Sequence, residues 1–337
     1  MGQSTIANAM IMTAGLGTRL QPFTNVRTKA LLPVLGIPSA QYALDSLVAA
    51  GVTKVVANVH HLAQDTARRM EELDLNGAEL RIKDESSLLL GTAGGIRNAL
   101  DELGSLPFFR ANADVIYDID WNALFQTHLE LRRSRGVLIT LAVLPSGPRD
   151  AQYPEILYDG NERLVTGIGK PQSSRPFWTG AAVIEPEALL GVTQDGPSEF
   201  VPEILAPAIR NQRAGVFVED GLWYDIGSPS LWLDTHFDLM RLFESTHEKN
   251  DRIRLWEKRF LTTNDSLGKN CWAHTSQRTQ LGKNTLEIQG PCYLGGVNQV
   301  GVEKVQVGPN AVIYDQMPPL GVKIENGIAF GGYWVKK

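Results

Sequence analysis

Short apolar runs alternate with amphipathic segments along the first 120 residues. The apolar runs are rich in Val, Ile, Ala and Phe and predict buried strands over 7–15, 54–61, 78–85 and 108–120. Between them, apolar residues recur at helical spacing or follow a glycine turn, which predicts helices over 39–51, 63–73 and 91–103. This alternation predicts an α/β fold with a doubly wound, mostly parallel sheet. In such sheets ligands bind at the carboxyl ends of the strands.

The pattern continues less regularly to about residue 260 and then changes. We expect a strand over 136–145, shorter strands within 153–185, a helix over 199–211 despite its prolines, and one or two helices over 229–258. Beyond them, glycines and β-forming residues dominate. Ile288, Leu294, Val300 and Val312 follow a six-residue spacing that Gln306 interrupts, which leaves a short left-handed β-helix and an irregular β-domain as alternatives. We therefore expect a main domain over 1–258 and a small β-rich C-terminal domain over 259–337.

Composition narrows the classes of partner. The formal net charge is -5 and no basic cluster occurs, which argues against a nucleic-acid partner. No apolar run has the ~20 residues of a membrane helix, and the N-terminus lacks the basic and apolar regions of a signal peptide. Cys271 and Cys292 form no CxxC pair, so we expect reduced structural thiols and no zinc site. These features predict a cytoplasmic protein without membrane contact.

A glycine-rich turn follows the first predicted strand, and Gly15 and Gly17 would let the backbone approach a phosphate closely. Two common phosphate loops are excluded. The pattern GxxxxGK[ST] does not occur in the chain, and GxGxxG fails because Leu20 replaces its third glycine.

The longer string around this turn carries a specific resemblance. "GLGTRLQPFT" followed by "KALLPV" resembles the signature of the sugar-1-phosphate nucleotidylyltransferases, and the branch with mannose-1-phosphate guanylyltransferase activity looks most similar. The string departs at Phe23 and at Thr28, where the family usually has proline. The resemblance extends over about residues 8–235 and implies a Rossmann-like nucleotidyltransferase sheet.

Further motifs follow in the family's order. "GTAGGI" at 91–96 resembles the loop that reads the base, "NADV" resembles the strand that carries a metal carboxylate, and "GKP" resembles the family's EKP. Ala113 and Gly169 depart from the family pattern, and the lost glutamate at 169 bears on which sugar is bound. The resemblance implies that Arg19 and Lys29 are catalytic and that Asp114 and Asp225 bind the metal. The implied nucleotide-binding residues are Ala14, Gly15, Gly17, Thr18, Gly91, Thr92 and Asn112. The implied sugar-phosphate-binding residues are Lys170, Gly180 and Glu199.

The implied reaction is attack of a sugar-1-phosphate oxygen on the α-phosphorus of an NTP, with pyrophosphate leaving. Two polyanions must meet, so positive charge and alignment are required rather than a covalent group. Arg19 would hold the leaving phosphates, Lys29 the α-phosphate and Lys170 the sugar phosphate. Asp114 and Asp225 would bind Mg²⁺, for which Mn²⁺ could substitute. The phosphate nucleophile is already ionised, so no general base is needed.

Several alternatives stay open. The muramate-phosphate uridylyltransferases and the heptose-phosphate enzymes look nearly as similar, so a uridylyl- or thymidylyltransferase for another sugar-1-phosphate is one alternative. A non-catalytic regulatory subunit that binds nucleotide sugar is an alternative from a different class of protein. We expect the product to serve polysaccharide or cell-envelope biosynthesis. By resemblance, the C-terminal domain would mediate homo-oligomer contacts or regulation; acyl transfer is disfavoured because His274 is its one candidate catalytic histidine. His60 and His61 end a strand on the ligand side, but a structural role is favoured for them.

Overall fold

The computed structural model describes residues 6–146, 153–171, 175–193, 196–246, 248–268, 271–275, 286–288, 290–295, 305–314 and 323–337. The chain packs into two compact units. The first contains Met1–Gly15 and Ala43–Trp223, and the second contains Leu16–Tyr42 and Tyr224–Lys337. These units are defined by packing and are discontinuous in sequence, so they do not test the predicted domain boundary at residue 258. That boundary stays a prediction.

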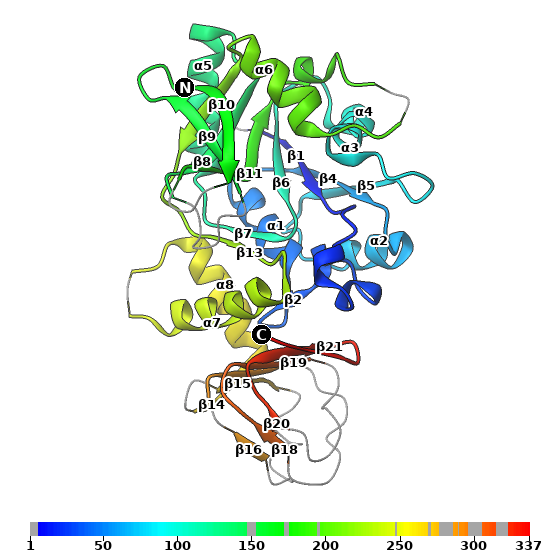
Figure 1. The fold of residues 1–337 in the computed structure, drawn as a ribbon, viewed down its shortest axis with the longest axis vertical. Helices are drawn as coiled ribbons and strands as arrows, with labels where there is room; N and C mark the ends of the chain where they lie inside the picture. Colours follow the sequence, from blue (N-terminus) through cyan, green and yellow to red (C-terminus); the bar gives the residue numbers. More distant parts are fainter. Residues whose placement is uncertain are drawn as a thin grey trace. The chain divides into compact units, whose positions relative to one another are not determined.

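A nine-stranded sheet forms the centre of the first unit (Figure 1). Its strands lie in the order β5-β4-β1-β6-β11-β8-β12-β10-β9. Their bounds are β1 Asn8–Met12, β4 Lys54–Val59, β5 Glu79–Asp84, β6 Phe108–Asn112, β8 Ile139–Leu144, β9 Pro154–Asp159, β10 Leu164–Pro171, β11 Phe177–Ile184 and β12 Ala214–Val218.

Strand directions confirm the predicted doubly wound sheet. β5, β4, β1 and β6 run parallel to one another, as do β8 and β12. β11 inserts antiparallel between β6 and β8, and β9 and β10 form an antiparallel edge. The chain order reverses between β1 and β6, which is the switch point where such sheets bind ligands. The turns after β1 and after β6 carry the predicted phosphate loop and the predicted metal carboxylate.

Helices cover both faces of this sheet because neighbouring strand residues point to opposite sides. Phe108 packs in a core with residues of α3 (Gly91–Asn98), α4 (Leu100–Leu103) and α6 (Ala206–Arg210), which follows a π-helical turn over Val201–Leu205. Phe109 points the other way and packs edge-on against Trp121 and Phe125 of α5 (Trp121–Arg135). α1 (Ser39–Ala49) and α2 (Ala63–Glu71) complete the helical layers. The buried faces of these helices follow the helical spacing seen in the sequence.

The second unit begins with a chain of tight turns. 3₁₀ turns span Thr18–Leu20, Phe23–Asn25 and Lys29–Leu31, and a small hairpin joins β2 (Pro33–Val34) to β3 (Ile37–Pro38). α7 (Pro229–Glu244) and α8 (Asp251–Thr263) belong to the same unit. Each of these two helices has a side-chain N-cap, from Ser228 and Asn250.

After α8 the chain forms stacked parallel strands. β15 (Cys271–His274), β17 (Cys292–Gly295), β19 (Ala311–Tyr314) and β21 (Gly327–Phe330) form one parallel ladder, and β16 (Leu286–Ile288), β18 (Val305–Val307) and β20 (Lys323–Ile324) form a second. β14 (Asn264–Gly268) and β22 (Tyr333–Lys336) pair antiparallel at the ends of the first ladder. We call this set of strands the strand stack.

The strand stack has the β-rich character that the sequence predicted. Its two ladders alternate along the chain, as they do in a coil of parallel strands. Cys271 and Cys292 lie opposite each other in neighbouring strands as buried free thiols. A left-handed coil stays a prediction, and Val300 of the six-residue pattern lies outside the described residues.

Candidate active site

The glycine-rich loop after β1 folds back on itself at Gly17. Gly17 has φ of +61°, and a Cβ at this position would lie 2.7 Å from Thr24 Cγ2 and 3.3 Å from Lys29 Cβ. The Thr24 hydroxyl donates a hydrogen bond to the Gly17 carbonyl at 3.0 Å. Glycine is therefore required here by a close approach as well as by its backbone conformation. The fold brings Gly17 against Lys29, which lies twelve residues further along the chain.

Lys29 reaches a carboxylate from a distant part of the sequence. Its Nζ lies 3.4 Å from Asp225 Oδ1 at the end of β13 (Trp223–Asp225), and both side chains are largely buried. Arg19 approaches the same carboxylate: a Cβ placed on Gly227 would lie 2.7 Å from Asp225 Oδ2 and 2.9 Å from Arg19 Nη2. Two predicted cations and one predicted metal ligand are thus gathered at one point of the second unit.

The departures at Phe23 and Thr28 do not disturb this loop. Phe23 is fully buried and packs edge-on against Trp232 at 5.3 Å. Thr28 is also buried, and its φ of -62° lies in the range that a proline ring imposes. The backbone before Lys29 therefore has a φ that the family's proline could also adopt.

In the first unit, the predicted base loop is fixed to the segment around Ser198. The Ser198 carbonyl accepts hydrogen bonds from the amides of Ala93 and Gly94, at 2.9 and 3.2 Å. The Thr92 hydroxyl lies 2.7 Å from Glu199 Oε2. Gly91 has φ of +74°, and a Cβ there would lie 2.5 Å from the Ser198 carbonyl oxygen. The structure therefore joins Thr92, a predicted nucleotide contact, to Glu199, a predicted sugar contact.

A chain of buried polar groups supports the base loop from behind. Asn58 Oδ1 accepts from the Thr13 amide at 3.0 Å, and Asn58 Nδ2 donates to Glu85 Oε1 at 2.9 Å. Glu85 Oε2 accepts from the Leu90 amide at 3.2 Å. Burial raises the pKa of Glu85. His60 Nδ1 lies 2.7 Å from the Glu85 carbonyl oxygen, which fits a structural role for His60.

The predicted metal strand ends in a compact group of side chains. Asn112 ends β6, and Asp114 follows in the half-exposed turn before β7 (Val115–Tyr117). The Tyr117 hydroxyl accepts from the Asn112 amide at 2.9 Å. Gly180 has φ of +92°, and a Cβ there would lie 2.5 Å from Asn112 Nδ2 and 3.1 Å from the Tyr117 hydroxyl. The fold thus places the Gly180 backbone directly against Asn112.

A buried arginine lies beneath this group. Arg110 is 4% exposed and donates to the Gly180 carbonyl. Its guanidinium lies 4.9 Å from the centre of the Trp178 ring and 5.9 Å from that of Phe200. Burial lowers the pKa of Arg110, although arginine stays charged. Arg110 therefore fixes the carbonyl of a predicted sugar-binding glycine.

Lys170 is exposed in β10, and among the described residues no hydrogen bond or ion pair joins it to another predicted site residue. The neighbouring Gly169 is where the family usually has glutamate. A Cβ at Gly169 would lie 3.0 Å from Glu155 Oε2 of the adjacent strand β9. A carboxylate from another strand thus occupies the space over Gly169.

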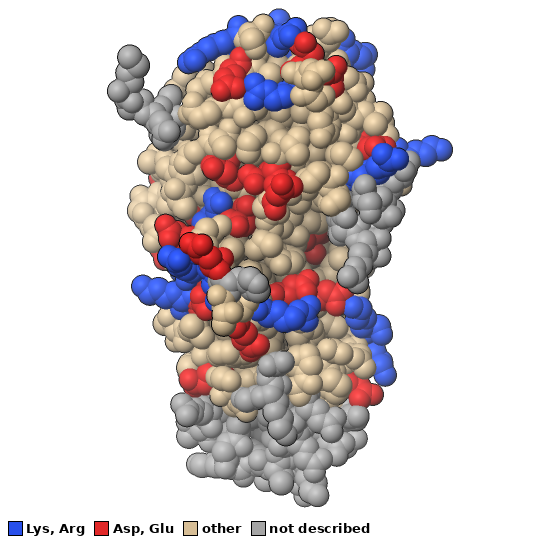
Figure 2. Space-filling view, turned by 90° about the vertical axis from the view of Figure 1, so that its left-hand side faces the viewer, with Lys and Arg blue, Asp and Glu red and all other residues tan. Residues whose placement is uncertain are grey.

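The charges of the second-unit cluster suit a polyanion and a hard cation. Arg19 and Lys29 supply two positive charges beside Asp225. Within the described ranges no three His, Cys, Asp or Glu side chains converge, so a Mg²⁺ ion would take one or two carboxylates and complete its shell with water and phosphate oxygens. Figure 2 shows one face of the molecule, on which Lys and Arg side chains are scattered among Asp and Glu side chains.

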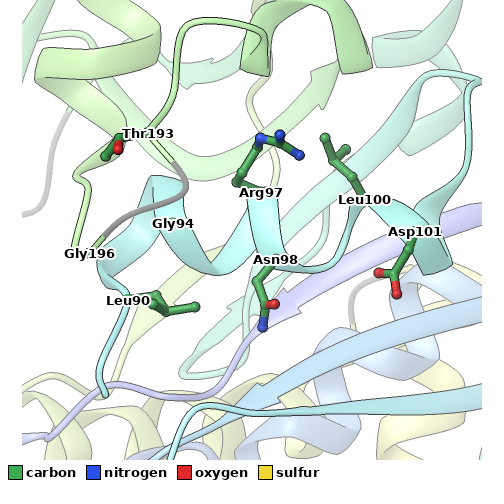
Figure 3. A pocket seen from close by; sticks show the side chains of 8 residues that line it. All are labelled: Leu90, Gly94, Arg97, Asn98, Leu100, Asp101, Thr193 and Gly196. Atoms are coloured by element: carbon green, nitrogen blue, oxygen red, sulfur yellow. The ribbon is translucent and has the colours of Figure 1, made fainter. Parts of the chain in front are cut away.

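A separate cavity of about 370 Å³ lies beside α3 (Figure 3). Arg97 and Asn98 project in different directions from the same helix there, and Asp101 lies beyond Leu100. None of the predicted site residues lines this cavity. This cavity is therefore distinct from the clusters of predicted site residues described above.

Sequence reasoning missed several residues of these clusters, among them Glu85, Arg110, Tyr117 and Glu155. Glu85 carried a usable signal, since it is a carboxylate at the end of a predicted strand, where ligand sites of such sheets lie. Arg110 also carried one, because it is a lone charge inside an apolar run. Glu155 could be found only from the pairing of β9 with β10.

Comparisons with known proteins agree with the sequence resemblance. Residues 8–241 match the family model described as nucleotidyl transferase. An N-acetylmuramate alpha-1-phosphate uridylyltransferase of Neisseria meningitidis serogroup B is 31% identical over 65% of this chain and 93% of its own length. The catalytic subunit beta of a mannose-1-phosphate guanylyltransferase from Drosophila pseudoobscura pseudoobscura is 30% identical over 68% of this chain and 62% of its own.

Solved structures agree at the level of the fold. The structure of HddC from Yersinia pseudotuberculosis, complexed with GMP-PN, superposes with a TM-score of 0.56 at 18% identity. The match covers 69% of this chain and 99% of that one. Among the described residues no helix is both long and apolar enough to cross a membrane.

Proposed function

The chain belongs to the nucleotidyl transferase family, as a sugar-1-phosphate nucleotidylyltransferase, and on that premise we propose that it makes GDP-mannose from GTP and mannose-1-phosphate. Pyrophosphate is the second product. The amino-acid sequence of the loop at 91–96 and the guanylyltransferase relatives support GTP as the nucleotide substrate. The nucleotide sugar would serve polysaccharide or cell-envelope biosynthesis in the cytoplasm.

One observation carries this proposal. Lys29 and Asp225 are 196 residues apart in the sequence, yet their side chains lie 3.4 Å apart. Arg19 Nη2 and Asp225 Oδ2 both lie within 3 Å of the position that a Cβ on Gly227 would take. Packing alone would not require two cations and a carboxylate to meet at a glycine-lined turn. A site that binds phosphates together with a divalent cation has this composition.

The chemistry follows from the charges. Lys29 neutralises the α-phosphate as negative charge develops there, and Arg19 holds the departing pyrophosphate. Lys170 binds the sugar phosphate, whose oxygen is the nucleophile. The base lies on the loop of Gly91 and Thr92, and Gly180 and Glu199 contact the sugar. We add Glu155 as a sugar contact, because its carboxylate lies where a side chain at 169 would be.

Mg²⁺ fits the donors that the chain offers. Asp114 and Asp225 would hold it through carboxylate oxygens, the ligand type that this ion prefers. When bound, the ion would offset part of the charge of the triphosphate. Ala14, Gly15 and Thr18 contribute backbone around the phosphates; Gly15 is exposed, and a Cβ there would meet nothing within 4 Å.

Uridylyl transfer to N-acetylmuramate-1-phosphate is the second candidate. It is favoured by two relatives above 30% identity, from Neisseria meningitidis and Caulobacter vibrioides, whose lengths are covered to 93% and 92%. The two candidates differ in base and sugar but share the phosphate chemistry. An assay of substrate preference therefore distinguishes the two candidate reactions, whereas mutations of the phosphate-binding residues would affect both.

The deciding experiment is pyrophosphate release with Mg²⁺ across GTP, UTP, dTTP, CTP and ATP against a panel of sugar-1-phosphates. We expect release with GTP and mannose-1-phosphate. Lys29→Met should lower kcat at least ~100-fold, as the loss of one preorganised charge does elsewhere. Asp225→Asn should raise the Mg²⁺ concentration needed for half-maximal rate.

Asp159→Asn is the matched control, because Asp159 is an exposed carboxylate at the end of β9 that caps its own turn. It should leave kcat and the Mg²⁺ requirement unchanged. Release with UTP and N-acetylmuramate-1-phosphate alone would select the second candidate. A chain that binds nucleotide sugar but releases no pyrophosphate with any pair would contradict both candidates.

A further inference from the structure

One hydroxyl of the strand stack touches the segment that carries the two predicted catalytic cations. The Tyr314 hydroxyl, at the end of β19, lies 2.6 Å from His236 Nε2 of α7. It also lies 3.2 Å from the Gly36 amide and 3.3 Å from the Pro33 carbonyl. All four residues belong to the second unit, and Gly36 and Pro33 lie in the same turn-rich segment, 16–42, as Arg19 and Lys29.

The donors and acceptors of this group are determined by their partners. His236 Nδ1 lies 2.8 Å from the Trp232 carbonyl, which can only accept, so Nδ1 carries the hydrogen. Burial lowers the pKa of His236 to about 4, and the ring is neutral at pH 7. Nε2 therefore accepts from Tyr314, whose oxygen accepts from the Gly36 amide. The Trp232 indole N–H donates a hydrogen bond to the Pro33 carbonyl at 2.8 Å, so this carbonyl is satisfied without the Tyr314 hydrogen.

A second contact joins the strand stack to the same segment. The Arg27 guanidinium lies 5.3 Å from the centre of the Phe330 ring. Gly331, in the turn between β21 and β22, has φ of +58°, and a Cβ there would lie 2.5 Å from Val26 Cγ2. The adjacent Gly332 also has positive φ, of +83°, but a Cβ there would meet nothing within 4 Å. Of these two glycines, only Gly331 packs so closely against Val26 that a side chain there would collide with it.

We propose that the strand stack is a positioning element for the segment 16–42, and that Tyr314 is its positioning residue. The hydroxyl holds the Gly36 turn, and the 3₁₀ turn over Lys29–Leu31 lies directly before that hairpin. The Ser39 hydroxyl donates to the Ala30 carbonyl at 2.9 Å, which joins the far side of the hairpin to the Lys29 turn. The catalytic part of this inference rests on the proposed function; the structural part does not.

Tyr314→Phe removes only the hydroxyl, and Tyr293→Phe is its matched control. Tyr293 is a buried tyrosine of the same ladder whose hydroxyl also lies beside Gly36, where a Cβ would come within 2.7 Å of it, but this hydroxyl donates to Asn264 at 3.0 Å. The pair therefore separates the loss of the hydrogen bond to the Gly36 amide from the loss of a neighbouring hydroxyl. Hydrogen–deuterium exchange without substrates should be about tenfold faster around Gly36 in Tyr314→Phe only, the size of one lost hydrogen bond. In turnover assays kcat should fall about tenfold in Tyr314→Phe, with the KM for the sugar phosphate unchanged.

Gly331→Ala and Gly332→Ala form a second pair that leaves Tyr314 intact. Both variants bear a similar backbone strain at positive φ, but only Gly331→Ala pushes on Val26. We expect faster exchange in 16–42 and lower kcat for Gly331→Ala alone. Equal exchange within both pairs would overturn the proposal. Selective exchange in a protein that releases no pyrophosphate with any substrate would uphold the positioning and reject the proposed function instead.

Discussion

At the scale of single residues, the two glycines of the predicted phosphate loop have different surroundings. Gly17 sits in the left-handed region against Thr24 and Lys29, so its glycine is explained by the fold itself. Gly15 faces open space, so nothing in the folded chain requires glycine there. The proposed nucleotide would supply a physical reason for a glycine at this position, because its phosphates would approach the backbone closely.

This difference predicts opposite behaviour of two alanine variants. Gly17→Ala should destabilise the protein by about 1–2 kcal/mol, since the left-handed conformation disfavours a Cβ and Thr24 would have to move. Gly15→Ala should leave the melting temperature unchanged and weaken nucleotide binding. Thermal unfolding and nucleotide titration measure the two effects. Equal losses of melting temperature in both variants would refute the assignment.

At position 169, a carboxylate from a neighbouring strand occupies the space of a missing side chain. Gly169 lacks the glutamate that the family resemblance leads one to expect, but Glu155 of the neighbouring strand fills the space above it. A carboxylate can therefore be present at a site although the motif that usually supplies it is incomplete. Under the proposed function, the sugar preference would depend on this carboxylate and on Glu199 rather than on residue 169.

At the scale of elements, the carboxyl ends of the parallel strands are joined by buried polar groups. Thr13 follows β1, Asn58 belongs to β4 and Glu85 follows β5, and their hydrogen bonds lead to the amide that opens the base loop. A buried acceptor with several donors rigidifies what it touches, and its loss leaves those donors unsatisfied. The base loop is thus held by the sheet as well as by Ser198.

Glu85→Ala should therefore cost about 1–3 kcal/mol of unfolding free energy, because Asn58 Nδ2 and the Leu90 amide would lose their acceptor inside the protein. It should also speed hydrogen exchange at Leu90 and raise the KM for the NTP. Urea unfolding, exchange and steady-state kinetics provide these values. Glu79→Ala, which removes an exposed carboxylate at the start of β5, should stay within about 0.5 kcal/mol of the wild type. The interpretation fails if the two variants lose equal stability.

At the scale of the whole molecule, the second unit is held together by an aromatic core drawn from distant segments. Trp232 packs against Phe23, Tyr314 and Phe330, and His236 lies beside Tyr293 and Tyr314. This core contains a titratable group that is neutral in the folded state. Stability of the unit should therefore depend on pH.

The sign follows from the pKa of His236. It is about 4 in the folded protein and about 6.5 in an unfolded chain, so between these values only the unfolded state binds the proton. The unfolding free energy should fall as pH falls from 6.5 to 4, by on the order of 3 kcal/mol at most. Glu85 acts in the opposite direction, because its pKa is raised and the folded state retains the proton.

His236→Gln separates the two groups, since it removes one titration and leaves the other. Urea unfolding at a series of pH values should show a steeper loss on acidification in the wild type than in this variant. Parallel curves for the two proteins between pH 6.5 and 4 would show that His236 is not the group responsible.

The sequence by itself determined most of the elements and the family, and it predicted which residues form the site. Apolar spacing predicted the strands and helices, glycine turns marked the strand ends, and the string from Gly15 to Val34 identified the family, because all of these are local patterns. One predicted strand, over 108–120, breaks into β6 and β7 at Ala113 and Asp114, since the chain turns at the carboxylate. Only the tertiary structure decided that Asp225 meets Lys29, that Glu155 covers Gly169, and that Tyr314 reaches Gly36. Those contacts join residues tens to hundreds of positions apart or on paired strands, and strand register and core packing, which no local pattern records, bring them together.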